Sequence, residues 1–140
     1  MSDLRRWLSR VSRLQQVHNA RYEQGRRSER LARQFLKSHG FVIEQTNVRY
    51  PVGELDIVAQ EGSALCFVEV RSKTSDRFGS AAESITHKKR QHLLRAAQWY
   101  LARRRVRWMG EVRFDVLAID FPKDGKPLIE LIRGAWTSDS

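Results

Sequence analysis

One segment, Gly53 to Arg71 with the sequence GELDIVAQEGSALCFVEVR, constrains the fold of this chain more than any other. It contains two apolar runs of strand length, which are separated by Gly62-Ser63. A two-residue loop with glycine first is typical of a type II′ turn, so the runs are expected to form a tight antiparallel hairpin. Glu61 then pairs with Ala64, and the residue numbers in every further pair add up to 125.

Two acids oppose each other in this register, Asp56 on the first strand and Glu69 on the second. Side chains alternate along a strand, so both acids share one face with Arg71. Ionised carboxylates about 5 Å apart repel by roughly 3 kcal/mol at an effective dielectric of about 20. A proton on one acid, Arg71 or a divalent cation could relieve this repulsion, unless the acids simply point into solvent. A slip of one residue would separate them.

Apolar spacing predicts the remaining elements. The expected helices cover residues 4–17, 22–39 and 85–105, and the expected strands cover residues 41–49, 54–60, 64–71, 112–120 and 128–133, with a looser polar segment over 72–84. Short turns between consecutive strands favour antiparallel pairs, and the long helix allows a crossover to a parallel neighbour, which indicates an α/β fold. The predicted organisation is a basic amphipathic helix over 1–20, one domain over 21–136 and a loose tail over 137–140.

The charge is distributed in blocks. The net charge is +10, with +7 in residues 1–40, −4 in 41–70, +9 in 71–107 and −2 in 108–140. Arginine outnumbers lysine by 20 to 6, which suits bidentate contact with phosphate. A polyanionic partner, most often nucleic acid, is therefore expected, and the alternative is a solvated basic face.

Several classes of protein are disfavoured. Cys66 is the single cysteine, so a disulfide framework or a cysteine zinc site is excluded. No apolar stretch approaches the ~18 residues of a membrane span, no signal-like start is present, and a cytoplasmic location is expected.

The apolar face that begins at Leu4 and Trp7 could pack on its own domain, pair with a partner helix or lie on a membrane surface.

The motifs GRRSERLARQFL, NVRYPVGELD, FVEVRSKT, FGSAAESITHKKR, AAQWYL and RFDVLAID closely resemble the YraN-like family of small bacterial proteins, over about residues 22–121. The resemblance implies the restriction-endonuclease-like, or PD-(D/E)XK, fold, which is similar to that of archaeal Holliday-junction resolvases. This fold has a mixed sheet of about five strands flanked by helices, in the order α-β-β-β-α-β-β. The extra N-terminal helix lies outside the family. Because resolvase-like relatives are often dimers, a homodimer is expected.

The resemblance also implies a site in which Glu29, Asp56 and Glu69 hold Mg²⁺ or Mn²⁺. Glu29 could instead form a simple ion pair with Arg33, one turn further along its helix. Arg71 stands where the superfamily has lysine; it cannot act as a base, because its pKa is above 12, but it can stabilise charge on a phosphate. Contacts with nucleic acid are expected from Arg71, Lys73, Lys88, Lys89, Arg90 and Arg95.

These features predict a Mg²⁺-dependent nuclease that binds structured or branched DNA, with DNA preferred to RNA. The alternative is an adaptor that binds nucleic acid, keeps the nuclease fold and has no catalytic activity.

Overall fold

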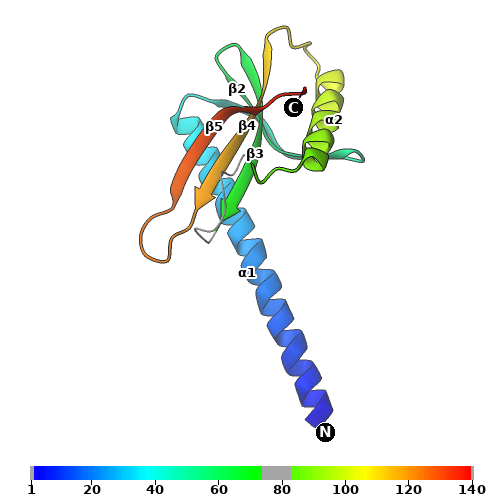
Figure 1. Ribbon diagram of the computed structural model, residues 1–140, viewed down its shortest axis with the longest axis vertical. Helices are drawn as coiled ribbons and strands as arrows, with labels where there is room; N and C mark the ends of the chain where they lie inside the picture. Colours follow the sequence, from blue (N-terminus) through cyan, green and yellow to red (C-terminus); the bar gives the residue numbers. More distant parts are fainter. Residues whose placement is uncertain (1, 74–82, 140) are drawn as a thin grey trace.

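The computed structural model describes residues 2–73 and 83–139, in which the predicted order α-β-β-β-α-β-β is confirmed, except that the extra N-terminal helix is not a separate element (Figure 1). The elements are α1 (Ser2–Ser38), β1 (Val42–Tyr50), β2 (Gly53–Glu61), β3 (Ala64–Lys73), α2 (His87–Arg103), β4 (Glu111–Asp120) and β5 (Leu128–Trp136). The predicted polar segment over 72–84 and the motif FGSAAES fall mainly on residues 74–82, outside the described part.

The five strands form one mixed sheet in the spatial order β1-β2-β3-β4-β5. Neighbouring strands are antiparallel except β3 and β4, which are parallel and are joined through α2. The crossover expected from the long helix is therefore observed, because parallel neighbours need a long connection.

Helices cover both faces of the sheet, which explains the continuous apolar run in β3. Leu65 and Phe67 pack with residues of α2, whereas Cys66 and Val68 pack with Ala32 and Leu36 of α1. A strand buried on both faces needs apolar residues at consecutive positions. Burial, with the negative charge of Asp115, raises the pKa of the Cys66 thiol to about 12, as suits an unreactive core residue.

The predicted hairpin register is confirmed where the two strands pair, but the predicted pair of Asp56 with Glu69 lies beyond the paired residues, because the strands part before it. Pairs run from Glu61 with Ala64 to Ile57 with Val68, and Gly62 has a φ of 57°, the positive value that the first position of a type II′ turn requires. Beyond the Ile57–Val68 pair β2 continues beside β1, whereas β3 continues beside β4. The two strands therefore part at this point, which we call the strand fork.

The two helices predicted before the sheet are one continuous helix, so the predicted break near residue 20 is wrong. No proline interrupts residues 18–24, and Gly25 has no positive φ, so nothing in the chain ends the helix there. The N-terminal half of α1 projects away from the sheet, and its side chains from Asp3 to Tyr22 are exposed (Figure 1). The first apolar face therefore does not pack on its own domain.

Across residues 2–73 and 83–139, neither helix combines the length and apolar character needed to span a bilayer.

Candidate active site at the strand fork

Asp56 and Glu69, which we call the acid pair, lie at the strand fork. Leu55 would face Val70 if the hairpin register continued, but β2 and β3 have already parted. The N–H of Val70 instead donates a hydrogen bond of 2.9 Å to Oδ2 of Asp56. The Asp56 carboxylate thus accepts the hydrogen bond that a backbone carbonyl of a neighbouring strand would otherwise accept from Val70. This bond holds the Asp56 side chain beside β3.

Glu69 is buried, and its surroundings raise its pKa. Its side chain is 8% exposed. Burial and the negative charge of Asp56 raise the pKa of Glu69 from 4.5 to about 7, although Lys89 and Arg71 oppose the shift. Burial and the charge of Asp56 therefore favour the neutral form of Glu69, and a proton held by the acid pair would relieve the predicted repulsion.

Two cations also approach Glu69. The Nε atom of Arg71 and the Nζ atom of Lys89 each lie 3.8 Å from its Oε1 atom. The Arg71 Nε atom is buried and has no hydrogen-bond partner among residues 2–73 and 83–139. Both cations stand beyond the usual hydrogen-bond length of about 2.7–3.2 Å, so neither forms a hydrogen bond with this carboxylate oxygen.

Lys89 belongs to the first turn of α2, where its N–H donates to the Thr86 hydroxyl at 3.1 Å. The sequence predicted Lys89 only as a phosphate contact, and its place beside the acid pair was missed. Thr86 could have located the start of the helix, because threonine is a favoured N-cap residue. It could not have shown which side of the helix faces Glu69, because helix packing on the sheet decides that.

Apolar side chains surround the acid pair on the side of α2. Leu55, Phe67, Leu93, Phe114 and Trp136 line a cavity of about 10 Å³ that also touches Asp56 and Glu69, among other residues. This volume is about that of one water-sized probe. The apolar wall limits the water around Glu69, which is the physical origin of its raised pKa.

Glu29 does not join the acid pair. Its Oε2 atom accepts a hydrogen bond of 3.3 Å from Nδ2 of Asn47 in β1. Within 2–73 and 83–139, no group of three His, Cys, Asp or Glu residues is arranged to hold a metal ion. The structure therefore brings together two of the three implied ligands. Glu29 is carried by α1, whereas the acid pair faces α2 across the sheet.

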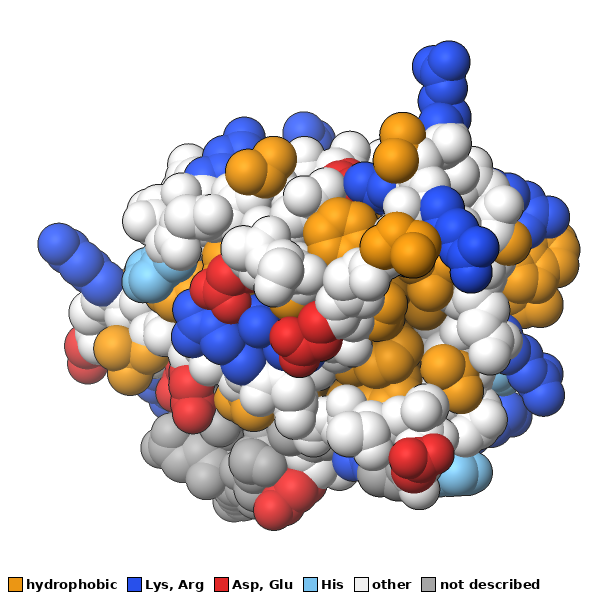
Figure 2. All heavy atoms as spheres, turned by 90° about the horizontal axis from the view of Figure 1, so that it is seen from above, with side chains coloured by type: hydrophobic (Ala, Val, Ile, Leu, Met, Phe, Trp, Pro, Cys, Tyr) orange, Lys and Arg blue, Asp and Glu red, His pale blue; other side chains and the backbone are white. Residues whose placement is uncertain are grey.

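The other predicted phosphate contacts are spread along α2. Lys88 and Arg95 are exposed, and Arg90 is half-buried with an Nε atom that has no hydrogen-bond partner in the described part of the chain. The Lys73 side chain lies outside the described part. Figure 2 shows Lys and Arg side chains around much of the periphery of one face of the molecule.

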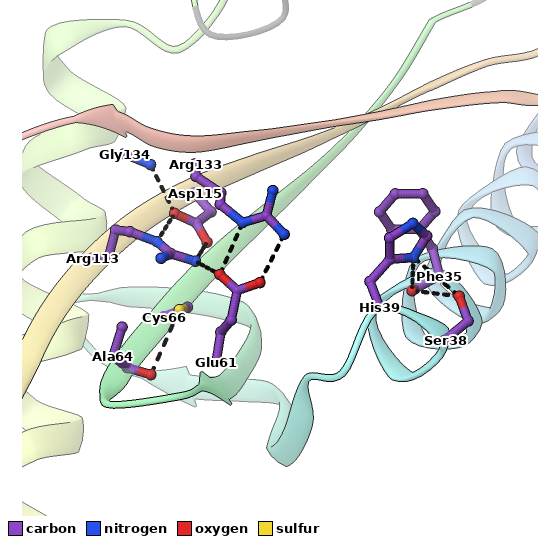
Figure 3. Close-up of polar contacts among 10 residues, drawn as sticks. All are labelled: Phe35, Ser38, His39, Glu61, Ala64, Cys66, Arg113, Asp115, Arg133 and Gly134. Atoms are coloured by element: carbon purple, nitrogen blue, oxygen red, sulfur yellow. Dashed lines mark hydrogen bonds and ion pairs between the residues drawn. The ribbon is translucent and has the colours of Figure 1, made fainter.

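A second polar cluster is structural. Asp115 is fully buried and accepts two hydrogen bonds from Arg113 and one from the Gly134 N–H (Figure 3). Glu61 accepts hydrogen bonds from Arg113 and Arg133. These bonds join β2, β4 and β5, and they leave both carboxylates well paired, so the cluster stabilises the sheet rather than offering a binding site.

Comparison with known proteins identifies relatives by sequence. The profile of "Uncharacterised protein family UPF0102" matches residues 28–119. A UPF0102 protein of Dehalococcoides mccartyi is 41% identical over 115 residues, covering 82% of this chain and 93% of that protein. A UPF0102 protein of Desulfosudis oleivorans is 39% identical over 121 residues, covering 86% and 95%. One of Hahella chejuensis is 46% identical over 93 residues, covering 66% and 74%.

Proposed function

The chain belongs to the uncharacterised protein family UPF0102, and from the acid pair at its strand fork we propose that it is a Mg²⁺-dependent nuclease acting on structured or branched DNA. The proposed fold is the restriction-endonuclease-like one, with which the five-stranded mixed sheet and two helices are consistent. The observation that carries the proposal is the position of Asp56 and Glu69, whose carboxylates meet where two neighbouring strands part.

The residues present fit a hard divalent cation. Mg²⁺ prefers oxygen ligands, keeps several waters and is often bound through one or two carboxylates together with substrate phosphates. Asp56 and Glu69 would hold it, without a requirement for Glu29. When bound, the ion would polarise the phosphate and supply a water of lowered pKa as nucleophile. Arg71 would stabilise the charge on the scissile phosphate.

The basic side chains would hold the DNA backbone. Lys88, Arg90 and Arg95 belong to α2, the helix that carries Lys89 beside Glu69, and would contact phosphates of the DNA backbone near the cut. Binding of this kind releases counterions, so affinity for DNA should fall steeply with salt.

A cleavage panel tests the proposal. Labelled linear, flap and four-way-junction DNA would be incubated with Mg²⁺ or Mn²⁺ and the parent protein, Asp56→Ala or Glu69→Ala. We expect metal-dependent cutting by the parent and a loss of at least about 100-fold in both variants, because each removes a carboxylate that would hold the metal. Glu54→Ala is the matched control, since this acid of β2 is 59% exposed in its side chain and pairs with Arg49. The absence of cutting by the parent, or equal cutting by Asp56→Ala, would refute the nuclease.

A second candidate is an adaptor without catalysis, favoured by Arg71 in the lysine position and by the separation of Glu29 from the acid pair. It predicts salt-dependent DNA binding that needs no metal and survives Asp56→Ala. Arg71→Lys separates the two candidates further: a gain of cleavage would show that arginine attenuates an enzyme, because lysine can lose its proton and arginine cannot.

A further inference from the structure

Two cations from different elements lie beside Glu69 of the acid pair, Arg71 from β3 and Lys89 from α2. The geometry points to Lys89 as the functional lysine of the site: its ammonium occupies the cation position beside Glu69 in the metal-free protein, and it turns to the scissile phosphate when a divalent ion takes that position. This inference rests on the proposed function and adds a residue to it.

Lys89 is suited to such an exchange. Its backbone is fixed by the Thr86 cap, and α2 is anchored by the buried Leu93, Ala96 and Ala97. Its side chain is 38% exposed, so the ammonium can move on a flexible stem. Arg71 is more constrained, because its Nε atom is buried. The two side chains are almost equally exposed, at 35% and 38%, so the difference lies in their chemistry: the Lys89 ammonium is a single charge at the end of a flexible stem, whereas the Arg71 guanidinium is planar and partly buried.

The helix position of Lys89 argues against a purely structural ion pair. The N-terminus of a helix carries a partial positive charge, which favours acids and disfavours cations. The first turn of α2 nevertheless begins His87-Lys88-Lys89-Arg90 and contains no acid. The pair with Glu69 is only partly exposed, 38% for the Lys89 side chain and 8% for that of Glu69, but its separation of 3.8 Å is longer than a hydrogen bond, so no close contact offsets this. Cations in this place are favourable when an anion is bound in front of them, as a DNA phosphate would be.

The test compares Lys89→Ala with Lys126→Ala, which removes the same charge from the exposed turn between β4 and β5. Single-turnover cleavage at saturating DNA is expected to fall about 100-fold or more in Lys89→Ala, as when one charge-stabilising donor is lost. Mn²⁺ binding to the protein alone, measured by titration calorimetry, is expected to tighten several-fold, because no ammonium competes for Glu69. Lys126→Ala should match the parent in both measurements.

The two measurements separate the possible failures. If Lys89→Ala cuts as fast as a cutting parent, or if its Mn²⁺ affinity is unchanged or weaker, the inference is overturned. If the parent cuts no DNA, the proposed function fails, and tighter Mn²⁺ binding by Lys89→Ala would still support Lys89 as the occupant of the cation position. If neither protein binds Mn²⁺, the inference is overturned as well.

Discussion

At the scale of single residues, Glu44 connects β1 to the end of α2. It accepts hydrogen bonds of 2.6 Å from both Tyr100 Oη and Gln60 Nε2, and it pairs with the guanidinium of Arg104. Burial alone would raise the pKa of Glu44, but the hydrogen bonds from Arg104, Tyr100 and Gln60 outweigh it and lower the pKa from 4.5 to about 2. The charged form of Glu44 therefore stabilises the fold.

Glu44→Ala should destabilise the protein by about 2–4 kcal/mol, because it leaves the Tyr100 hydroxyl without its acceptor and removes the carboxylate partner of Arg104. Urea unfolding followed by circular dichroism measures this. Glu54→Ala is the control and should change the free energy of unfolding by less than about 0.5 kcal/mol, since its ion pair with Arg49 is exposed. Equal losses in the two variants would contradict the assigned role of Glu44.

Glu44 should also make the free energy of unfolding depend on pH. The pKa of Glu44 is lower in the folded protein, about 2, than its ordinary value of 4.5, so its contribution is complete above pH 4.5 and is lost as the pH falls toward 2. The difference in unfolding free energy between the parent and Glu44→Gln should therefore shrink over this range. A difference that stays constant or grows on acidification would show that the charge of Glu44 is not the source of its contribution.

At the scale of elements, the features set by local interactions could be predicted. Gly62-Ser63 and the alternation of side chains fix the hairpin register as far as Ile57 and Val68, which places Asp56 and Glu69 directly after the last pair; the parting of the strands at that point was not predicted. The positions of Lys89 and Glu29 could not be predicted, because they depend on how α2 and α1 pack against opposite faces of the sheet. The length of α1 was missed because a helix ends only where the chain supplies a stop, and none stands near residue 20.

Gly53 sets the distance between β2 and α2. A Cβ atom at Gly53 would lie 2.8 Å from the backbone oxygen of His92. Gly53→Ala should therefore push the strand and helix apart and destabilise the protein by about 1–3 kcal/mol in urea unfolding. Gly25→Ala, in the interior of α1 with no atom within 4 Å of the added Cβ, should have the opposite sign and stabilise the helix by up to about 1 kcal/mol. Effects of the same sign in both variants would contradict this account.

At the scale of the whole molecule, the two ends of α1 lie in different environments. Its C-terminal part carries Ser28, Ala32 and Leu36, which are buried against the sheet. Its N-terminal part presents a set of exposed apolar side chains, Leu4, Trp7, Leu8, Val11, Leu14 and Val17, each between 42% and 64% exposed. One continuous helix thus contributes to the core at its C-terminal end, whereas its side chains from Asp3 to Tyr22 are all exposed.

Removal of residues 1–20 should therefore leave the free energy of unfolding within about 1 kcal/mol of the parent, because exposed surface side chains contribute little to stability. The urea m-value should also be nearly unchanged, since m follows the surface exposed on unfolding. Leu36→Ala, near the C-terminal end of the same helix, should cost about 2–5 kcal/mol, because it opens a cavity in the core. If the truncated protein instead lost as much stability as Leu36→Ala, the exposed face of α1 would have to be buried in solution, against the domain or against another molecule.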